Sequence, residues 1–126
     1  MPLQQFRAFI KTAAFLTEQD CAFFEPHFKL HTIKAKELFT TPGKVCREIG
    51  FINKGAFRTY YIVGGKEINT CFFFENDFVV DYDSFLDEKP GKYYIEALED
   101  AEILVFTADV LRDAYRQSHN WERFGR

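Results

Sequence analysis

The sequence is poor in the residues that mark secretion and membrane insertion. Its three cysteines, Cys21, Cys46 and Cys71, are widely spaced and form no CxxC pair. We therefore expect reduced, buried thiols in a cytoplasmic protein rather than a disulfide framework. No apolar run approaches the roughly 20 residues that span a bilayer. The N-terminus also lacks the basic and apolar segments of a signal peptide.

Histidine is equally scarce, which bears on metal chemistry and catalysis. The chain has three histidines, at positions 27, 31 and 119, whereas a metal-dependent enzyme on a β-barrel would bring two or three together with a carboxylate. We expect His27 and His31 on one entering strand, where residues four apart lie about 13 Å from each other. The sequence contains no Ser-His-Asp pattern, GxSxG motif or P-loop. We therefore expect neither enzymatic activity nor a cofactor.

A strong excess of one charge is missing as well. The formal net charge is −3, which gives no electrostatic attraction toward nucleic acid. Four carboxylates gather within one short segment, but they lack the spacing and central glycine of a calcium-binding loop. We expect them to form a solvated face: Asp81, Asp83, Asp87 and Glu88.

Aromatic residues, in contrast, are abundant. They make up 18% of the 126 residues, with 16 phenylalanines, and this favours a domain built from sheets. The length suits one domain with its own core. Alternating patterns and turn signals every 8–12 residues or so predict about eight short strands, as in a sandwich or jelly roll. Those assigned to residues cover 28–32, 38–40, 48–53, 56–63, 66–74, 93–97 and 101–106.

Helices are predicted on both sides of the strands. Apolar residues at helical spacing predict one helix within residues 3–16, and Thr17 is placed to begin a second. Thr107 is the expected N-cap of a C-terminal helix, and a further helix is expected to begin near Trp121. Between positions 63 and 66, Gly64-Gly65 predicts a two-residue hairpin turn, because such turns need positive φ angles.

An ordered set of motifs resembles one family, the Crp/Fnr-type regulators. It runs from Pro42-Gly43 through Ile49–Ile52, Lys54-Gly55, Gly64-Gly65-Lys66-Glu67 and Asn76-Asp77-Phe78 to the segment 97–103. The match covers roughly residues 15–126. It most resembles Crp/Fnr-like proteins of the Bacteroidetes type, which also carry Phe-Phe-Glu-Asn and Asp-Tyr-x-Ser-Phe. The resemblance implies a mainly β fold, a cupin-like double-stranded β-helix (jelly roll) with flanking N- and C-terminal α-helices.

The resemblance also points to a phosphate-binding cassette that is degenerate here. In the family, a Gly-Glu pair opens a short helix, and an Arg followed by Ser or Thr completes the site. The Gly-Glu position reads Val80-Asp81, and the Arg position falls on Gly91 or Lys92. The residues expected to form the altered site are Val80, Asp81, Tyr82, Asp83, Ser84, Gly91, Lys92 and Tyr93.

Two interpretations of this segment stay open. In one, the cassette is a pocket adapted to another small ligand, cationic or neutral, because the Arg is missing and carboxylates are added. In the other, it is a packed lid whose interior is filled by Tyr82, Phe85, Tyr93 and Tyr94. Either way, we expect residues 1–126 to form one cyclic-nucleotide-binding-like sensor domain that does not bind cyclic nucleotides tightly.

The resemblance further implies partners. They are a small-molecule effector, a second copy joined through a completed C-terminal helix, and DNA bound only through a helix-turn-helix that these residues lack. We expect either a piece of a longer regulator or a stand-alone sensor. An Fnr-like iron–sulfur site would need an N-terminal cysteine cluster, which is missing. Two alternatives remain on the same fold: a cupin-fold metal-dependent enzyme and a purely structural dimerisation module.

Overall fold

Two four-stranded antiparallel sheets form the body of the computed structural model, which describes residues 3–10 and 25–117. One sheet has the order β1-β8-β3-β6 and the other β2-β7-β4-β5. The strands are β1 (Lys29–Ile33), β2 (Leu38–Thr40), β3 (Glu48–Lys54), β4 (Phe57–Val63), β5 (Lys66–Phe73), β6 (Phe78–Val79), β7 (Tyr94–Ala97) and β8 (Ala101–Thr107). The predicted mainly β fold is therefore confirmed.

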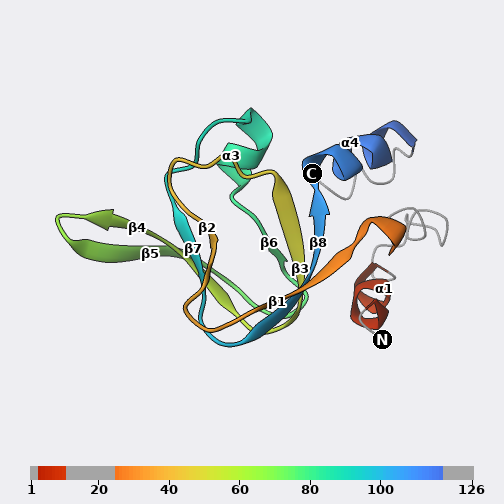
Figure 1. Ribbon diagram of the computed structural model, residues 1–126, viewed down its shortest axis with the longest axis horizontal. Helices are drawn as coiled ribbons and strands as arrows, with labels where there is room; N and C mark the ends of the chain where they lie inside the picture. Colours follow the sequence, from red (N-terminus) through yellow and green to blue (C-terminus); the bar gives the residue numbers. More distant parts are fainter. Residues whose placement is uncertain (1–2, 11–24, 118–126) are drawn as a thin grey trace.

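Helices precede β1 and follow β8, and one short helix lies between β6 and β7. They are α1 (Gln4–Ile10), the 3-10 helix η1 (Glu25–His27), α3 (Tyr82–Asp87) and α4 (Ala108–Gln117). Figure 1 shows α1 and α4 beside the β1-β8-β3-β6 sheet, with α3 above the strands. Within the described ranges, every helix is too short or too polar to cross a bilayer.

The central strands of the β1-β8-β3-β6 sheet, β8 and β3, are buried on both faces, whereas β1 is largely exposed. One face, together with α1 and α4, forms the outer cluster, which consists of Phe6, Cys46, Ile49, Phe51, Val80, Phe85, Leu104, Phe106, Ala108 and Ala114. The other face meets the second sheet in the inner cluster, which consists of Ile52, Phe57, Val79, Ile95, Ala97, Ala101, Ile103 and Val105. Successive strand residues point to opposite faces, so β3 and β8 supply both clusters and read as continuous apolar runs.

Phenylalanine dominates the outer cluster. The Phe6 ring lies edge-on to Phe51 with ring centroids 5.3 Å apart, and to Phe28 at 4.7 Å. Phe78 packs edge-on against Phe51 at 5.3 Å. Edge-to-face rings at such distances add to the stabilisation from burial itself. The phenylalanine content of the sequence is therefore used to attach the N-terminal helix to the sheet.

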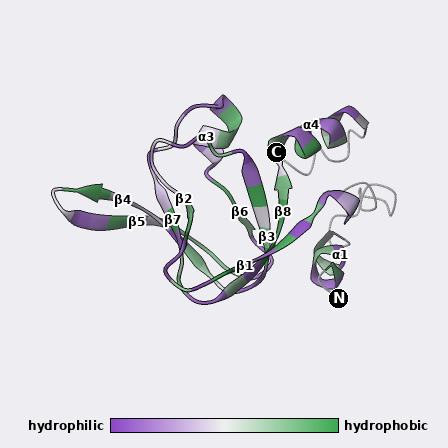
Figure 2. Cartoon of the chain, viewed as in Figure 1, coloured by the Kyte–Doolittle hydropathy of each residue, from purple (hydrophilic) through white to green (hydrophobic). Residues whose placement is uncertain are grey.

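The β4–β5 hairpin extends away from the rest of the fold (Figure 1). Its turn is Gly64-Gly65, with φ angles of 57° and 78°, and Val63 pairs with Lys66 across it. The predicted two-residue turn is confirmed. Figure 2 shows hydrophobic residues at the turn end of β4, where Ile62 and Val63 are 49% and 55% exposed. β5 forms the edge of its sheet.

Several sequence-based expectations were wrong in detail. His27 lies in η1 rather than on the strand that carries His31, because Pro26 fixes a helical turn there. Cys46 is buried as predicted, but Cys71 is exposed, because it lies on the edge strand β5. The predictions for the helix after Thr17, for Cys21, for His119 and for the segment from Trp121 fall outside the described residues.

Candidate functional site

The cassette segment contains a helix, α3, that begins at a buried carboxylate. Asp81 is the N-cap of α3, and its Oδ1 accepts a hydrogen bond from the Ser84 backbone N–H at 3.3 Å. Asp81 is 6% exposed. The sequence placed it on a solvated face, and this was wrong, because the carboxylate caps the helix instead of facing water. Asp83, Asp87 and Glu88 are exposed, as predicted.

Ser84 ties α3 to the start of β3. Its hydroxyl accepts from the Cys46 backbone N–H at 2.8 Å and donates to the Lys89 carbonyl at 2.6 Å. Ser84 is 2% exposed, so both bonds are made away from water, where a lost partner is costly. Ser84 is therefore a positioning residue of the cassette and presents no free hydroxyl to a ligand.

Gly91 is hydrogen-bonded through its backbone to the loop before β3. Its N–H donates to the Lys44 carbonyl at 2.9 Å, and its carbonyl accepts from the Gly43 N–H at 2.9 Å. A Cβ atom at Gly91 would collide with Oδ2 of Asp81. Position 91, one of the two positions that the resemblance aligned with an Arg, therefore accepts a side chain only if the Asp81 carboxylate moves.

The remaining predicted site residues separate into two groups. Val80 is 3% exposed and belongs to the outer cluster, so its side chain serves the core. Tyr82 is 54% exposed and does not fill a lid, which corrects the packed-lid interpretation for that residue. Phe85, in contrast, is buried as that interpretation expected. Lys92 and Tyr93 lie just before β7 and line a cleft.

This cleft has a volume of about 540 Å³ and lies between β4 and the segment that leads into β7. It is lined by Pro42, Tyr61, Ile62, Lys92, Tyr93 and Tyr94. The Tyr61 and Tyr93 rings meet edge to face with centroids 6.1 Å apart. Lys92 is the charged member of the lining and forms no ion pair with any residue of the described part. Aromatic walls with one cation suit a small ligand with a planar, apolar body.

One wall of the cleft is held by a polar cluster on the outer face of the second sheet. Tyr94 stacks on Tyr60 with ring centroids 4.9 Å apart, and the Arg58 guanidinium lies 4.1 Å above the Tyr60 ring. Arg58 donates to Glu96 at 2.8 Å, to Glu67 at 2.9 Å and to Asn69 at 3.0 Å. Burial, together with Glu96 and Glu67, raises the pKa of Tyr60. Arg58 is thus fully engaged within the sheet and is not available to a ligand.

Tyr61, Ile62, Pro42 and Tyr94 were not predicted as lining residues. Their contribution depends on the register in which β4 pairs with β7, which ends at Tyr60 and Tyr94. The alternation of apolar and polar residues in β4 and β7 predicts which face of the sheet each residue lies on, but it does not predict this register. The local signal was the pair of adjacent tyrosines in each segment, Tyr60-Tyr61 within β4 and Tyr93-Tyr94 at the entry to β7.

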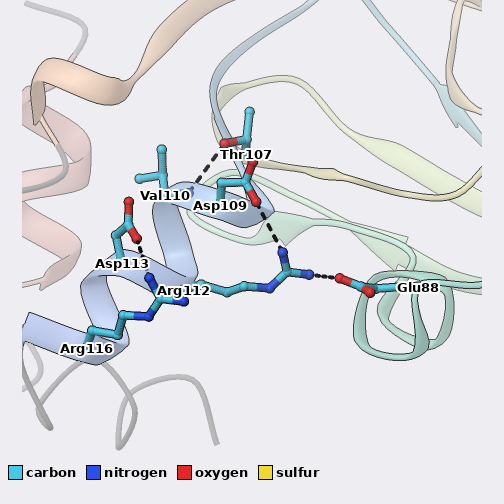
Figure 3. Close-up of polar contacts among 7 residues, drawn as sticks. All are labelled: Glu88, Thr107, Asp109, Val110, Arg112, Asp113 and Arg116. Atoms are coloured by element: carbon cyan, nitrogen blue, oxygen red, sulfur yellow. Dashed lines mark hydrogen bonds and ion pairs between the residues drawn. The ribbon is translucent and has the colours of Figure 1, made fainter.

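The C-terminal helix contacts the cassette through an ion pair. Thr107 caps α4 and accepts from the Val110 N–H at 3.4 Å, as predicted. Arg112 pairs with Asp109 at 3.1 Å and also reaches Glu88, the C-cap of α3 (Figure 3). Within the described residues, this ion pair joins the end of α3 directly to α4.

No group of three or more His, Cys, Asp or Glu side chains in the described ranges is placed to hold a metal ion. Burial raises the pKa of the Cys46 thiol, and the charges of Asp81 and Glu48 act in the same direction. A thiol of this kind stays protonated and is a poor metal ligand. The metal-enzyme alternative therefore has no donor set in this part of the chain.

Comparisons with known proteins agree with this geometry. The family model of the cyclic nucleotide-binding domain matches residues 30–118, while no curated protein matches the sequence. The catabolite activator protein of Thermus thermophilus has a similar structure, with a TM-score of 0.75 and 16% identity over 86% of this chain and 51% of its own. The regulatory domain of Toxoplasma gondii PKA, solved with cAMP, is also similar. Its TM-score is 0.77 at 12% identity, over 88% of this chain and 43% of that one.

A third similar structure is the N-terminal domain of a transcriptional regulator from Streptomyces coelicolor A3(2). Its TM-score is 0.72 at 12% identity, over 87% of this chain and 79% of that one. The chain spans about half the length of the Thermus protein, at 51%, and less of the Toxoplasma protein, at 43%. Identities this low show a shared fold alone.

Proposed function

The chain belongs to the cyclic nucleotide-binding domain family, and on that premise we propose that it is the ligand-sensing domain of a Crp/Fnr-type transcriptional regulator, similar to those of the Bacteroidetes. Its effector is a small molecule other than cAMP or cGMP. The effector lies in the cleft beside Lys92 and Tyr93, and the domain is regulatory rather than catalytic.

One observation carries the exclusion of cyclic nucleotides. Residues 80–93 contain no arginine, Arg58 is held by Glu67 and Glu96, and Arg112 is paired with Asp109 and Glu88. Lys92 supplies one point charge but not the bidentate fork that suits phosphate. The exposed carboxylates of α3 and its C-cap add negative charge to the same segment.

The signal from the site runs through α3. An effector in the cleft contacts Lys92 and Tyr93, which follow the loop that closes on Gly91, and this loop is bonded to α3 through Ser84 and the Lys89 carbonyl. A shift of α3 reaches α4 through Glu88 and Arg112. In the complete regulator, helices after α4 mediate homodimer formation, and a helix-turn-helix binds DNA.

Isothermal titration with cAMP and cGMP tests the ligand assignment. We expect no saturable binding at micromolar concentrations of either nucleotide, because the phosphate has no fork to bind. Binding of cAMP at micromolar concentration would show that the cassette accepts phosphate without an arginine and would overturn the proposal.

The cleft is tested by thermal-shift screening with a panel of uncharged aromatic metabolites. A compound that raises Tm is expected to lose its effect in Lys92→Ala or Tyr93→Ala. Lys89→Ala is the matched control, because Lys89 is also exposed but does not line the cleft. A stabilising compound that is indifferent to both cleft variants would place the effector elsewhere.

A further inference from the structure

The aromatic part of the cleft lies on the apolar side of its sheet. Tyr61 follows Phe57 of the inner cluster by four positions on β4, and alternate strand residues share a face, so Tyr61 lies on the face of that cluster. Its ring meets the Tyr93 ring edge to face, with an interplanar angle of 71°. Both tyrosines are half-buried. They therefore offer ring surface to a ligand on the side of the sheet opposite to Arg58.

Lys92 gives this cleft a positive charge that no lining residue balances. Among the described residues, the lining contains no acid, and Lys92 forms no ion pair. The base of its side chain is fixed, because the preceding residue, Gly91, is bonded through its backbone to Gly43 and Lys44 at 2.9 Å each. An ammonium group donates hydrogen bonds and accepts none. Its best partner in a ligand is therefore an anionic acceptor.

The acids of the cassette do not supply that partner. Asp81 is buried at the start of α3, Asp83 and Asp87 lie on α3, and Glu88 is paired with Arg112. None of these four acids lines the cleft. The expectation of a cationic or neutral ligand was based on them, so it does not describe the charge that a ligand meets beside Lys92.

From the lining we infer that the effector is a planar aromatic monocarboxylate. Its ring packs against Tyr61 and Tyr93, and its carboxylate binds the Lys92 ammonium. One carboxylate suits one point charge, whereas the fork that suits a phosphate is absent from the cleft. The cleft volume of about 540 Å³ is within the range of small-molecule sites. This inference rests on the proposed sensor function and adds the chemical class of the effector.

The first test compares aromatic acids with their uncharged counterparts. Benzoate, phenylacetate and cinnamate are each titrated beside the primary amide of the same acid, which keeps the ring and the shape but not the charge. We expect at least one acid to bind the wild type about fivefold or more tighter than its amide, by isothermal titration up to millimolar concentration. Added salt is expected to reduce this preference, because Lys92 is exposed.

Two cleft variants separate the contributions of charge and ring. Lys92→Gln is expected to lower the affinity for the acid to that for the amide and to leave the affinity for the amide unchanged. Tyr93→Leu is expected to weaken acid and amide alike, by about threefold or more, because a ring contact is lost. Lys89→Gln is the matched control: Lys89 is exposed but does not line the cleft, and its variant keeps the preference for the acid within about twofold.

The outcomes separate the effector class from the proposed function. If acid and amide bind equally well and both are weakened by Tyr93→Leu, the carboxylate class is wrong, and the cleft remains the binding site. The class is also wrong if the preference survives Lys92→Gln, if Lys89→Gln removes it as fully, or if none of the acids binds at millimolar concentration. The sensor function has its own test, since it is overturned by micromolar binding of cAMP to the wild type.

Discussion

Cys46 illustrates how one buried side chain responds to its surroundings. The thiol is 6% exposed, and its Sγ donates to the Glu48 carbonyl at 3.4 Å. Burial raises its pKa above the ordinary value of 9.0, and the negative charges of Asp81 and Glu48 add to the shift. The folded protein therefore holds the thiol proton at a pH at which the unfolded chain releases it.

This shift predicts a loss of stability at alkaline pH. The stabilisation that the raised pKa of Cys46 gives is fully present below the thiol's pKa in the unfolded chain. It is lost as pH rises from about 9 through the thiol's pKa in the folded protein, because over this range only the unfolded chain releases the proton. We expect Cys46→Ala to flatten the decline in unfolding free energy between about pH 8 and 10, by up to about 1.4 kcal/mol per pH unit. Urea denaturation at several pH values measures this dependence of the unfolding free energy on pH.

Cys71→Ala is the control for this prediction, because Cys71 is exposed on the edge strand. It is expected to keep the alkaline slope of the wild type. Equal slopes in the wild type and Cys46→Ala would mean that the thiol does not titrate differently in the folded state.

At the scale of the element, Arg58 joins three strands. It lies on β4, donates to Glu67 on β5 and to Glu96 on β7, and covers the Tyr60 ring. Its side chain is 17% exposed, so these bonds are made partly away from water. Removing the guanidinium leaves the carboxylates of Glu67 and Glu96 without their shared counter-charge.

We therefore expect Arg58→Ala to lower the unfolding free energy by roughly 1–3 kcal/mol. Chemical denaturation at pH 7 measures the loss. Arg116→Ala is the matched control, because the pair of Arg116 with Asp113 is exposed, with 78% of the Arg116 side chain accessible, and such pairs are worth about 0–1 kcal/mol. An equal effect of both variants would contradict a special role for Arg58.

The elements also show how far sequence reasoning reaches. Most strands were predicted within one or two residues, because alternation and turn chemistry are local properties of the chain. The two-residue strand β6 was missed, since it is defined by pairing with β3, 27 or more positions away. α3 was expected only through the family resemblance, and its six residues are too few to show helical periodicity.

The candidate site, too, was predictable from the sequence only in part. Lys92 and Tyr93 were predicted and do line the cleft. The burial of Asp81 could not be predicted, because it results from packing of the loop around Gly91 against the start of α3. Asp81 belongs to a residue type that favours the N-cap position, but a cap on the surface and a cap in a closed cassette have the same sequence.

At the scale of the whole molecule, the outer cluster joins the N-terminal helix, the sheet and α4 into one core. Phe6 is 1% exposed and contacts Phe28 and Phe51. Because Phe6 is fully buried in the outer cluster, we expect Phe6→Ala to cost about 3–5 kcal/mol in unfolding free energy. Thermal and urea unfolding measure the loss.

Phe72→Ala is the control for the core, since Phe72 is 47% exposed on β5, and a change within about 0.5 kcal/mol is expected for it. If Phe6→Ala lowered the unfolding free energy no more than Phe72→Ala does, α1 would not belong to the cooperative folding unit.

The contact between Asp81 and Gly91 also has a consequence for descent. A side chain introduced at position 91 meets the carboxylate of Asp81 first. An arginine gained there is therefore accommodated only if the Asp81 side chain moves or position 81 changes as well. A change of Asp81 to asparagine keeps the N-cap of α3, whereas a change to alanine removes it. Substitutions at the two positions are therefore expected to be coupled in evolution.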